Sequence, residues 1–263
     1  MGFFAALRQI FSLYTYRSAR SKKIRLFFII SMVPVVVLLV AKILEIAQPS
    51  ARISAEEIFS RILLVIYIQL LLPIMALFFG SSIVQEEVEN RTLVFLTTAP
   101  ISRSSILLGK YLSYLLLSVV IVHAGFIFSF IIINLDHLGG VRGFGVFLNF
   151  MGVGLLALAS YIAFFALLGT VFRKSLILGL MFIFGWESIV QYFPGTTQKF
   201  TLIHYVKSLL PASSGNVKFL VLRLEPSPAF ESMAVLIGIA LISLIAASVV
   251  FKRKEYSLRD NLS

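Results

Sequence analysis

The sequence lacks several features that would indicate a soluble or secreted protein. None of its 263 residues is cysteine, which excludes disulfide bonds and thiolate chemistry and leaves no clue to a redox compartment. Only 13% of the residues are charged, about half the share usual in soluble domains, whereas 59% are hydrophobic. A water-soluble fold of this length has too little interior for so many apolar side chains. The chain is therefore predicted to lie in a lipid bilayer.

The alternation of polar and apolar residues that marks membrane β-strands is also lacking. The apolar runs are instead continuous over about twenty residues, the length that an α-helix needs to cross a bilayer. Spanning segments must be helices or a closed barrel, because an unpaired backbone amide in hydrocarbon costs several kcal/mol. The sequence therefore predicts an all-α, polytopic membrane protein.

Six spans are predicted, preceded by an amphipathic segment. Residues 1–25 combine apolar side chains at helical spacing with a basic cluster, a pattern typical of an interfacial helix on anionic lipid. The six-helix domain covers 26–251, and a tail over 252–263 follows. The predicted spans are residues 26–46, 58–84, 106–133, 146–172, 175–193 and 230–251.

The distribution of basic residues predicts the orientation. With the N-terminus inside, the cytoplasmic segments hold fourteen Lys and Arg residues and the opposite loops hold six. Six spans return the C-terminus to the same side, so both termini are predicted to lie in the cytoplasm and the protein in the cytoplasmic (inner) membrane. The net charge of +11 is then explained by helix ends and lipid headgroups, and no nucleic-acid partner is expected.

The cytoplasmic loop 85–105 between spans two and three carries the most information. It has an acidic start, which favours a helix N-terminus, and an apolar middle that ends before Pro100. Ser102 can then cap the next helix. From these residues alone, a loop helix that rests on the membrane surface is an equally good interpretation.

The same loop resembles that of a known family. The acidic cluster is followed by Thr-Leu at 92–93, Pro-x-Ser-Arg at 100–103 and Leu-Leu-Gly-Lys at 107–110, which opens a span. This pattern resembles the ABC-2 type permease family, the membrane subunits of ABC transporters. The resemblance covers the whole chain. It implies the ABC-2 type exporter fold with an N-terminal elbow helix, and an assembly of two permease subunits, identical or related, with two ATPase subunits.

The resemblance also implies roles for individual residues. The positions expected to couple the chain to the ATPase subunit are Glu86, Glu87, Glu89, Arg91, Thr92, Pro100 and Arg103. Gly109 and Lys110 match the pattern that starts the third span. One departure is that the family often has Gly before the Thr, whereas Arg91 occupies that place here, so the local turn is expected to differ.

A nucleotide-binding motif is lacking. No G-x-x-x-x-G-K-[ST] occurs, and Gly109-Lys110 is followed by Tyr111 at the membrane edge. The chain is therefore not expected to be an enzyme or to hold a cofactor, and ATP and Mg²⁺ are expected on the partner ATPase subunit.

Two ionisable residues inside predicted spans, His123 and Glu187, are candidates for a substrate pathway, because charge within a membrane is costly. The alternative is that they form interhelical hydrogen bonds worth about 1 kcal/mol each. The three histidines have no spacing that predicts a metal site, and neither paired carboxylates nor H-E-x-x-H occur within a span.

The outer loop 194–229 contains two amphipathic pieces, 200–210 and 217–224, that are too short to cross the bilayer. They could gate an exit path, dock an external partner or cap a subunit interface. Two functions therefore stay open: a permease that exports an unidentified substrate, and a mechanotransmission subunit that relays ATPase motion to an extracytoplasmic protein. A secondary transporter would require buried charges or an inverted repeat, and the sequence indicates neither.

Overall fold

The computed structural model describes residues 3–47, 59, 61–89, 102–135, 143–191, 193, 195–210 and 226–253. Over these residues the fold is helical and contains no strand, so the predicted all-α class is confirmed. The long helices are α1 (Phe3–Ala19), α2 (Lys22–Ala47), α4 (Leu72–Glu89), α6 (Arg103–Ile133), α7 (Phe144–Val171) and α12 (Ala229–Arg253). The shorter elements are the π-helices η1 (Leu63–Leu71) and η2 (Met181–Glu187), the α-helices α8 (Ser175–Leu180), α9 (Ser188–Val190) and α10 (Leu202–Ser208), and the 3₁₀ helix η3 (Gly195–Phe200).

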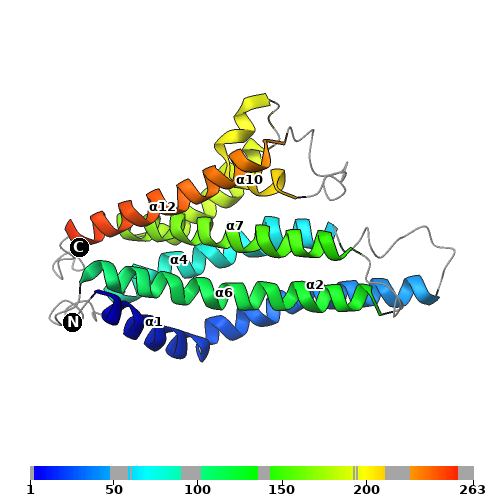
Figure 1. The fold of residues 1–263 in the computed structure, drawn as a ribbon, viewed down its shortest axis with the longest axis horizontal. Coiled ribbons are helices and arrows are strands. Elements are labelled where there is room, and N and C mark those ends of the chain that lie inside the picture. Colours follow the sequence, from blue (N-terminus) through cyan, green and yellow to red (C-terminus); the bar gives the residue numbers. More distant parts are fainter. Residues whose placement is uncertain are drawn as a thin grey trace.

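The long helices form an elongated bundle (Figure 1). α1 begins and α12 ends at the same end of this bundle, which we call the terminal end (Figure 1). α4 also ends there and α6 begins there, so the connection between them belongs to the terminal end. α10 packs against α12 near its first turns, away from the terminal end.

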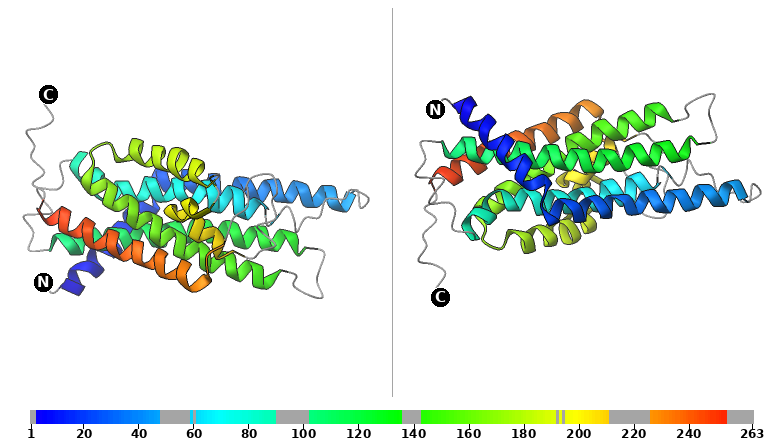
Figure 2. Two further views of the ribbon diagram at one scale, coloured as in Figure 1. Left: turned by 90° about the horizontal axis from the view of Figure 1, so that it is seen from above. Right: turned by 90° about the horizontal axis from the view of Figure 1, so that it is seen from below.

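Five of the described helical segments are long and apolar enough to cross a membrane. They are Lys22–Ala47, Leu63–Gln85, Arg103–Ile133, Phe144–Val171 and Ala229–Arg253. The fifth predicted span corresponds to a shorter apolar helix, Ser175–Val190, which π-helical turns interrupt. Since α7 and α12 both end toward the terminal end, the chain between them must travel away from that end before α12 begins (Figure 2). Six crossings therefore remain a prediction, and five span-length helices are what the structure contains.

Local sequence explains where two helices begin. The side chain of Ser102 accepts a hydrogen bond from the backbone N–H of Ser105 at 3.2 Å, so Ser102 caps α6 as predicted. α7 follows Gly143, whose φ of 71° lies in the left-handed region that favours glycine. Thr201 caps α10 by accepting from the N–H of His204 at 3.3 Å.

Small residues allow the helices to approach closely. A Cβ atom at Gly80 of α4 would lie 2.7 Å from the carbonyl oxygen of Ile162 in α7, and one at Gly169 of α7 would lie 3.0 Å from that of Ser81. α4 and α7 therefore pack backbone to backbone at the centre of the core, the role expected for small residues in membrane helices. Gly152 of α7, by contrast, has no neighbour within 4 Å of its Cβ position.

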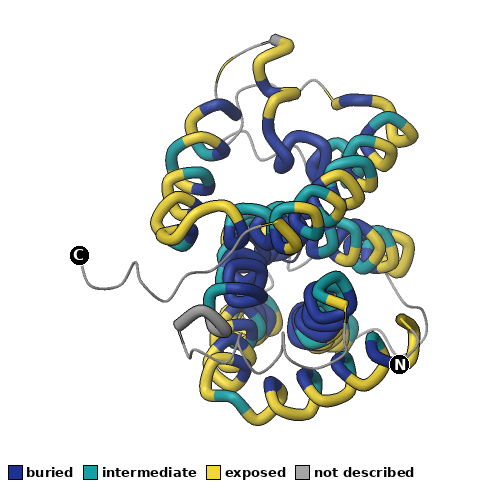
Figure 3. The backbone as a smooth tube through the Cα atoms, turned by 90° about the vertical axis from the view of Figure 1, so that its left-hand side faces the viewer, coloured by how far each residue is buried: buried dark blue, intermediate teal, exposed yellow. Residues whose placement is uncertain are grey.

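Apolar side chains also cover much of the outside of the bundle. Exposed residues face away from the bundle axis in the view along it, and buried residues face inward (Figure 3). Large apolar side chains remain exposed on α1, α2, α6, α7 and α12; Leu44 of α2, Phe128 of α6 and Ile242 of α12 are examples. Such a surface would aggregate in water, and it is stable where lipid surrounds it.

The N-terminal helix ends at Ala19, within the predicted N-terminal segment 1–25. It lies obliquely across the bundle and packs on α6 (Figure 2). The 85–105 segment was predicted to begin with a helix separate from the second span, whereas in the structure residues up to Glu89 continue α4. A continuous helix keeps the backbone bonds of that stretch intact, which a break at Gln85 would not.

Candidate functional site

The predicted coupling residues cluster by position at the terminal end. Glu86, Glu87 and Glu89 occupy the last turn of α4, and Arg103 opens α6. Arg91, Thr92 and Pro100 lie outside the described residues. The two helices that carry the 85–105 loop therefore present three acidic residues and one arginine at the end of the bundle where the chain also begins (Figure 1).

Arg103 contacts the C-terminus of α12. Its Nη1 donates to the carbonyl oxygens of Phe251 at 3.4 Å and Lys252 at 3.3 Å. The last carbonyls of a helix have no partner within the helix and carry partial negative charge, so a guanidinium stabilises them. The observed role of Arg103 is to hold α6 to α12, and contact with an ATPase stays a prediction for it.

Lys110 is fully buried and joins three helices. Its Nζ donates to the carbonyl oxygen of Ile83 in α4 at 2.8 Å and lies 4.6 Å from the ring centroid of Tyr14 in α1. A buried ammonium group requires such partners, because desolvation of the charge is costly. The sequence pattern that singled out Lys110 therefore reflects a tie between α1, α4 and α6.

Gly109 explains how α1 can approach α6. A Cβ atom there would lie 2.7 Å from Cγ2 of Ile10. Ile10, Tyr14 and Ile106 form a small apolar cluster between the two helices. The glycine in the Leu-Leu-Gly-Lys pattern is thus required by a close contact between helices.

Two further contacts fasten the end of α4. Lys23 of α2 donates to Oγ of Ser82 at 3.2 Å. Gln85 donates from Nε2 to the carbonyl oxygens of Phe172 at 3.4 Å and Arg173 at 2.7 Å, in the turn between α7 and α8. A displacement of the last turn of α4 would therefore act on α1, α2, α6 and α7 together.

On the other side of the molecule, Glu187 is buried and joins two elements to α10. Its Oε2 accepts from the Tyr161 hydroxyl of α7 at 2.6 Å, and its Oε1 accepts from the N–H groups of Leu202 at 3.0 Å and Ile203 at 3.3 Å. A carboxylate is favourable at the N-terminus of a helix, where N–H groups lack intrahelical partners. Glu187 thus anchors α10 of the outer loop to the bundle, which agrees with the interhelical hydrogen bond foreseen as the alternative to a substrate pathway.

Lys207 extends this polar cluster. Its Nζ donates to Oε1 of Gln191 at 2.7 Å, and Gln198 donates to the Gln191 carbonyl oxygen at 3.2 Å. Burial lowers the pKa of Lys207 to about 8, and the negative charge of Glu187 offsets part of this lowering. Sequence reasoning missed Lys207, which it counted as an outer-loop cation. The amphipathic pattern of 200–210 could have indicated it, since Lys207 falls among apolar residues.

His123 lies apart from this cluster. Its Nδ1 is 2.9 Å from the Val119 carbonyl oxygen and its Nε2 is 3.0 Å from that of Met151. A neutral imidazole can donate to only one of these two oxygens. The contacts of His123 and those of Glu187 share no residue, so the structure does not join the two into one site. Among the described residues, no group of three or more His, Asp or Glu side chains is placed to hold a metal ion.

The bundle of apolar, span-length helices defines a multi-pass membrane protein. Residues 9–256 match the family described as "ABC-2 family transporter protein", and the chain belongs to this family. It is therefore a membrane permease subunit of an ABC transporter, and the family implies an ABC ATPase subunit as its partner. A comparison with curated proteins finds no match.

Proposed function

We propose that this permease couples ATP hydrolysis in its partner to the export of a substrate across the cytoplasmic membrane, with its termini in the cytoplasm. The observation that carries the proposal is the terminal end of the bundle. The acidic last turn of α4 and the start of α6 lie there together, and both are fastened to neighbouring helices. An ATPase subunit bound at this end would move several helices at once.

The packing of the core supports a pathway between subunits rather than through one. α4 and α7 are in backbone contact at Gly80 and Gly169, which leaves no space between them. A second permease copy is therefore part of the proposal, and the substrate would pass along the contact between copies. Rotation of each bundle about that contact, driven from the terminal end, would open and close the path.

The direct test is co-purification of the partner. The full chain, tagged and extracted from native membranes in mild detergent, should carry an ATP-binding cassette subunit that mass spectrometry can quantify. Reversal of two charges, Glu86→Lys with Glu87→Lys, should lower the amount retained at least tenfold, since like charges across an interface cost several kcal/mol. The matched control is Glu231→Lys, a partly exposed glutamate at the start of α12. Equal retention by the double variant and wild type would overturn the proposed docking surface.

A second function, mechanotransmission to an extracytoplasmic protein, is favoured by the anchoring of α10. Because Glu187 joins α10 to η2 and α7, motion of the bundle would reach the exposed surface near Phe200, which is 73% exposed. The chain has no cysteine, so Phe200→Cys supplies a single crosslinking position. Capture of one external protein in intact cells would favour mechanotransmission, and export predicts that no protein is captured there.

A further inference from the structure

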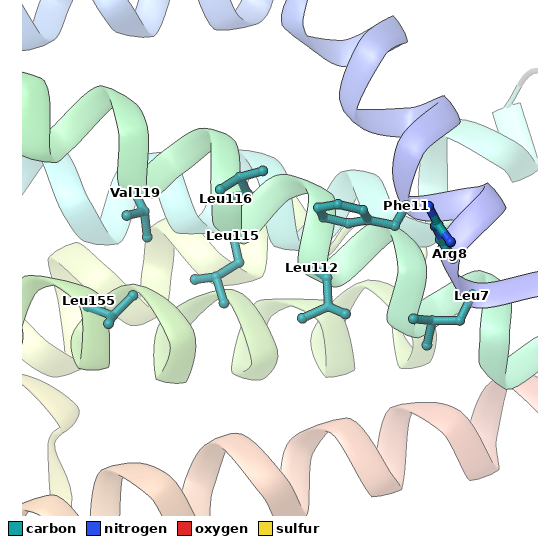
Figure 4. A pocket seen from close by; sticks show the side chains of 8 residues that line it. All are labelled: Leu7, Arg8, Phe11, Leu112, Leu115, Leu116, Val119 and Leu155. Carbon is teal, nitrogen blue, oxygen red and sulfur yellow. The ribbon is translucent and has the colours of Figure 1, made fainter. Parts of the chain in front are cut away.

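A groove of about 450 Å³ runs between α1 and α6 and reaches α7 at Leu155, in the middle of that helix (Figure 4). Leucines and valine of α6 form its floor, with apolar side chains of α1 and α7 at its sides (Figure 4). Arg8 of α1 stands at the end of the groove nearest the termini. The lining residues are Leu7, Arg8, Phe11, Leu112, Leu115, Leu116, Val119 and Leu155.

The surroundings of this groove are apolar as well. On α1 itself, Phe4 is 82% exposed and Leu13 is 60% exposed, so the helix that forms one wall lies in a setting that accepts apolar surface. Water is a poor occupant of a groove with one polar side chain, because it would find few hydrogen-bond partners. The occupant therefore has to be hydrocarbon along most of its length.

The dimensions favour a chain over a helix. Leu112 and Val119, at the two ends of the floor, are seven residues apart, or about 10 Å at 1.5 Å per residue. The groove is short and has a volume of about 450 Å³. One acyl chain therefore matches it better than a whole helix of a second permease copy, which is 10–12 Å across.

The single charge indicates the headgroup. Arg8 is exposed, and among the described residues it forms no ion pair. A guanidinium binds phosphate oxygens with two parallel hydrogen bonds, and basic positions between membrane helices bind anionic headgroups. Arg17 in the last turn of α1 and Arg20 in the turn that follows do not line the groove, so Arg8 is the basic side chain at it.

We propose that this groove binds one acyl chain of an anionic glycerophospholipid, with the lipid phosphate at Arg8. The lipid would lie against both α1 and α6, the two helices that Gly109 and Lys110 hold together. It would therefore act as a bound component of the contact that ties α1 to the start of α6. The site would exist whether or not the permease exports a substrate.

The test uses the full chain purified in detergent, stripped of lipid and incubated with phosphatidylglycerol or phosphatidylcholine. Native mass spectrometry should show one tightly bound phosphatidylglycerol per chain, with at least a tenfold preference over phosphatidylcholine. Leu116→Trp fills the groove and should abolish this bound lipid, whereas Ile127→Trp on the same helix should not. Leu116 and Ile127 are both 42% exposed, and Ile127 does not line the groove.

The headgroup contact is tested separately. Arg8→Gln should abolish the preference for phosphatidylglycerol but leave an acyl chain bound, and Arg20→Gln, in the turn that follows α1, should keep the preference. Because Arg8 is exposed, this variant should fold even if Leu116→Trp does not. Undiminished lipid binding by Leu116→Trp, or an undiminished preference in Arg8→Gln, would overturn the proposal. A Leu116→Trp variant that loses its second permease copy and keeps its lipid would also overturn it and assign the groove to the subunit contact.

Discussion

At the scale of single residues, Glu187 and Lys207 show how a charged side chain can be buried near the outer side of a membrane protein. Glu187 accepts from three donors, namely the Tyr161 hydroxyl and two N–H groups at the start of α10. Lys207 of α10 donates to Gln191, which lies one turn after Glu187 in the sequence. The contacts with Leu202, Ile203 and Lys207 join α10 to the bundle, and the contact with Tyr161 holds Glu187 against α7, so the charges position α10.

Removal of the Glu187 carboxylate should therefore be costly. Glu187→Ala leaves the Tyr161 hydroxyl and the N–H groups of Leu202 and Ile203 buried without their acceptor, at about 1–3 kcal/mol for each unsatisfied group. We expect a loss of about 3–5 kcal/mol in the free energy of unfolding, measured by thermal unfolding in detergent. Glu187→Gln, which keeps an acceptor oxygen, should lose less than about 1.5 kcal/mol. Glu231→Ala, in an exposed pair with Lys199, should change little, and an equal loss in the two alanine variants would contradict the anchoring role.

Lys207 predicts a dependence on pH. Its pKa is lowered from 10.5 to about 8 because burial disfavours the charged amine. Between pH 8 and 10.5 the unfolded chain holds a proton at this residue that the folded chain has lost, so stability should rise with pH across this window. The protection of the α10 amides, judged from their exchange rate relative to that of an unstructured peptide at the same pH, should increase over the same range in the wild type. Lys207→Met should lack this dependence, and a rise of equal size in the variant would assign it to another group.

At the scale of elements, the contact between α1 and α6 depends on Gly109. Even a methyl group there would press on Cγ2 of Ile10, whereas the Cβ position of Gly152 in α7 is open. Lys110 and the small cluster of Ile10, Tyr14 and Ile106 act at the same contact. Close packing at Gly109 and the contact of Lys110 with Tyr14 therefore both hold α1 against α6.

We expect Gly109→Ala to destabilise the protein by about 1–3 kcal/mol through overpacking. Gly152→Ala should be neutral or stabilising by up to about 1 kcal/mol, since alanine is the better helix former. Ile10→Ala removes the atom that the new methyl would meet, so the double variant should lose less than the sum of the two single changes. Thermal unfolding measures all four proteins, and strictly additive losses would show that Ile10 and residue 109 are not in contact.

At the scale of the whole molecule, five of the described helices have the length of a span, and the segment Ser175–Val190 is shorter. The predicted total of six spans and the cytoplasmic termini depend on whether this segment and its neighbours complete a crossing. α1 begins and α12 ends at the same end of the bundle, as an even number of crossings requires (Figure 1). Family membership adds an ABC ATPase subunit as a partner, and its contact with the loop between α4 and α6 stays a prediction.

Single cysteines can test this topology, because the chain has none of its own. A membrane-impermeant maleimide should label Phe200→Cys in intact cells, and it should label Phe4→Cys and Arg253→Cys only after permeabilisation. Phe4 and Phe200 are 82% and 73% exposed, and Arg253 is exposed at the end of α12. Labelling of Phe4→Cys and Arg253→Cys from opposite sides would indicate an odd number of crossings and contradict the predicted topology.

Much of the fold was predictable because the bilayer simplifies the problem. A continuous apolar run must form a helix in hydrocarbon. The positions of the apolar runs therefore predicted the five span-length helices, and most of the predicted ends lie within a few residues of the observed ones. The cap at Ser102 was predictable because it depends on neighbours three residues apart. The fifth predicted span, 175–193, corresponds to the shorter helix Ser175–Val190. The apolar run does not predict the π-helical turns that interrupt this helix.

The sequence by itself determined that the chain is an all-α membrane protein and, through the motif between the second and third spans, the family to which it belongs. Only the tertiary structure decided what the singled-out residues touch. Lys110 meets Ile83 and Tyr14, Arg103 meets the end of α12, and Glu187 meets α10. These partners are far apart in the sequence, and their pairing depends on how apolar helices of similar composition pack against one another. Hydropathy specifies that a helix enters the membrane, and shape and buried hydrogen bonds specify its neighbours.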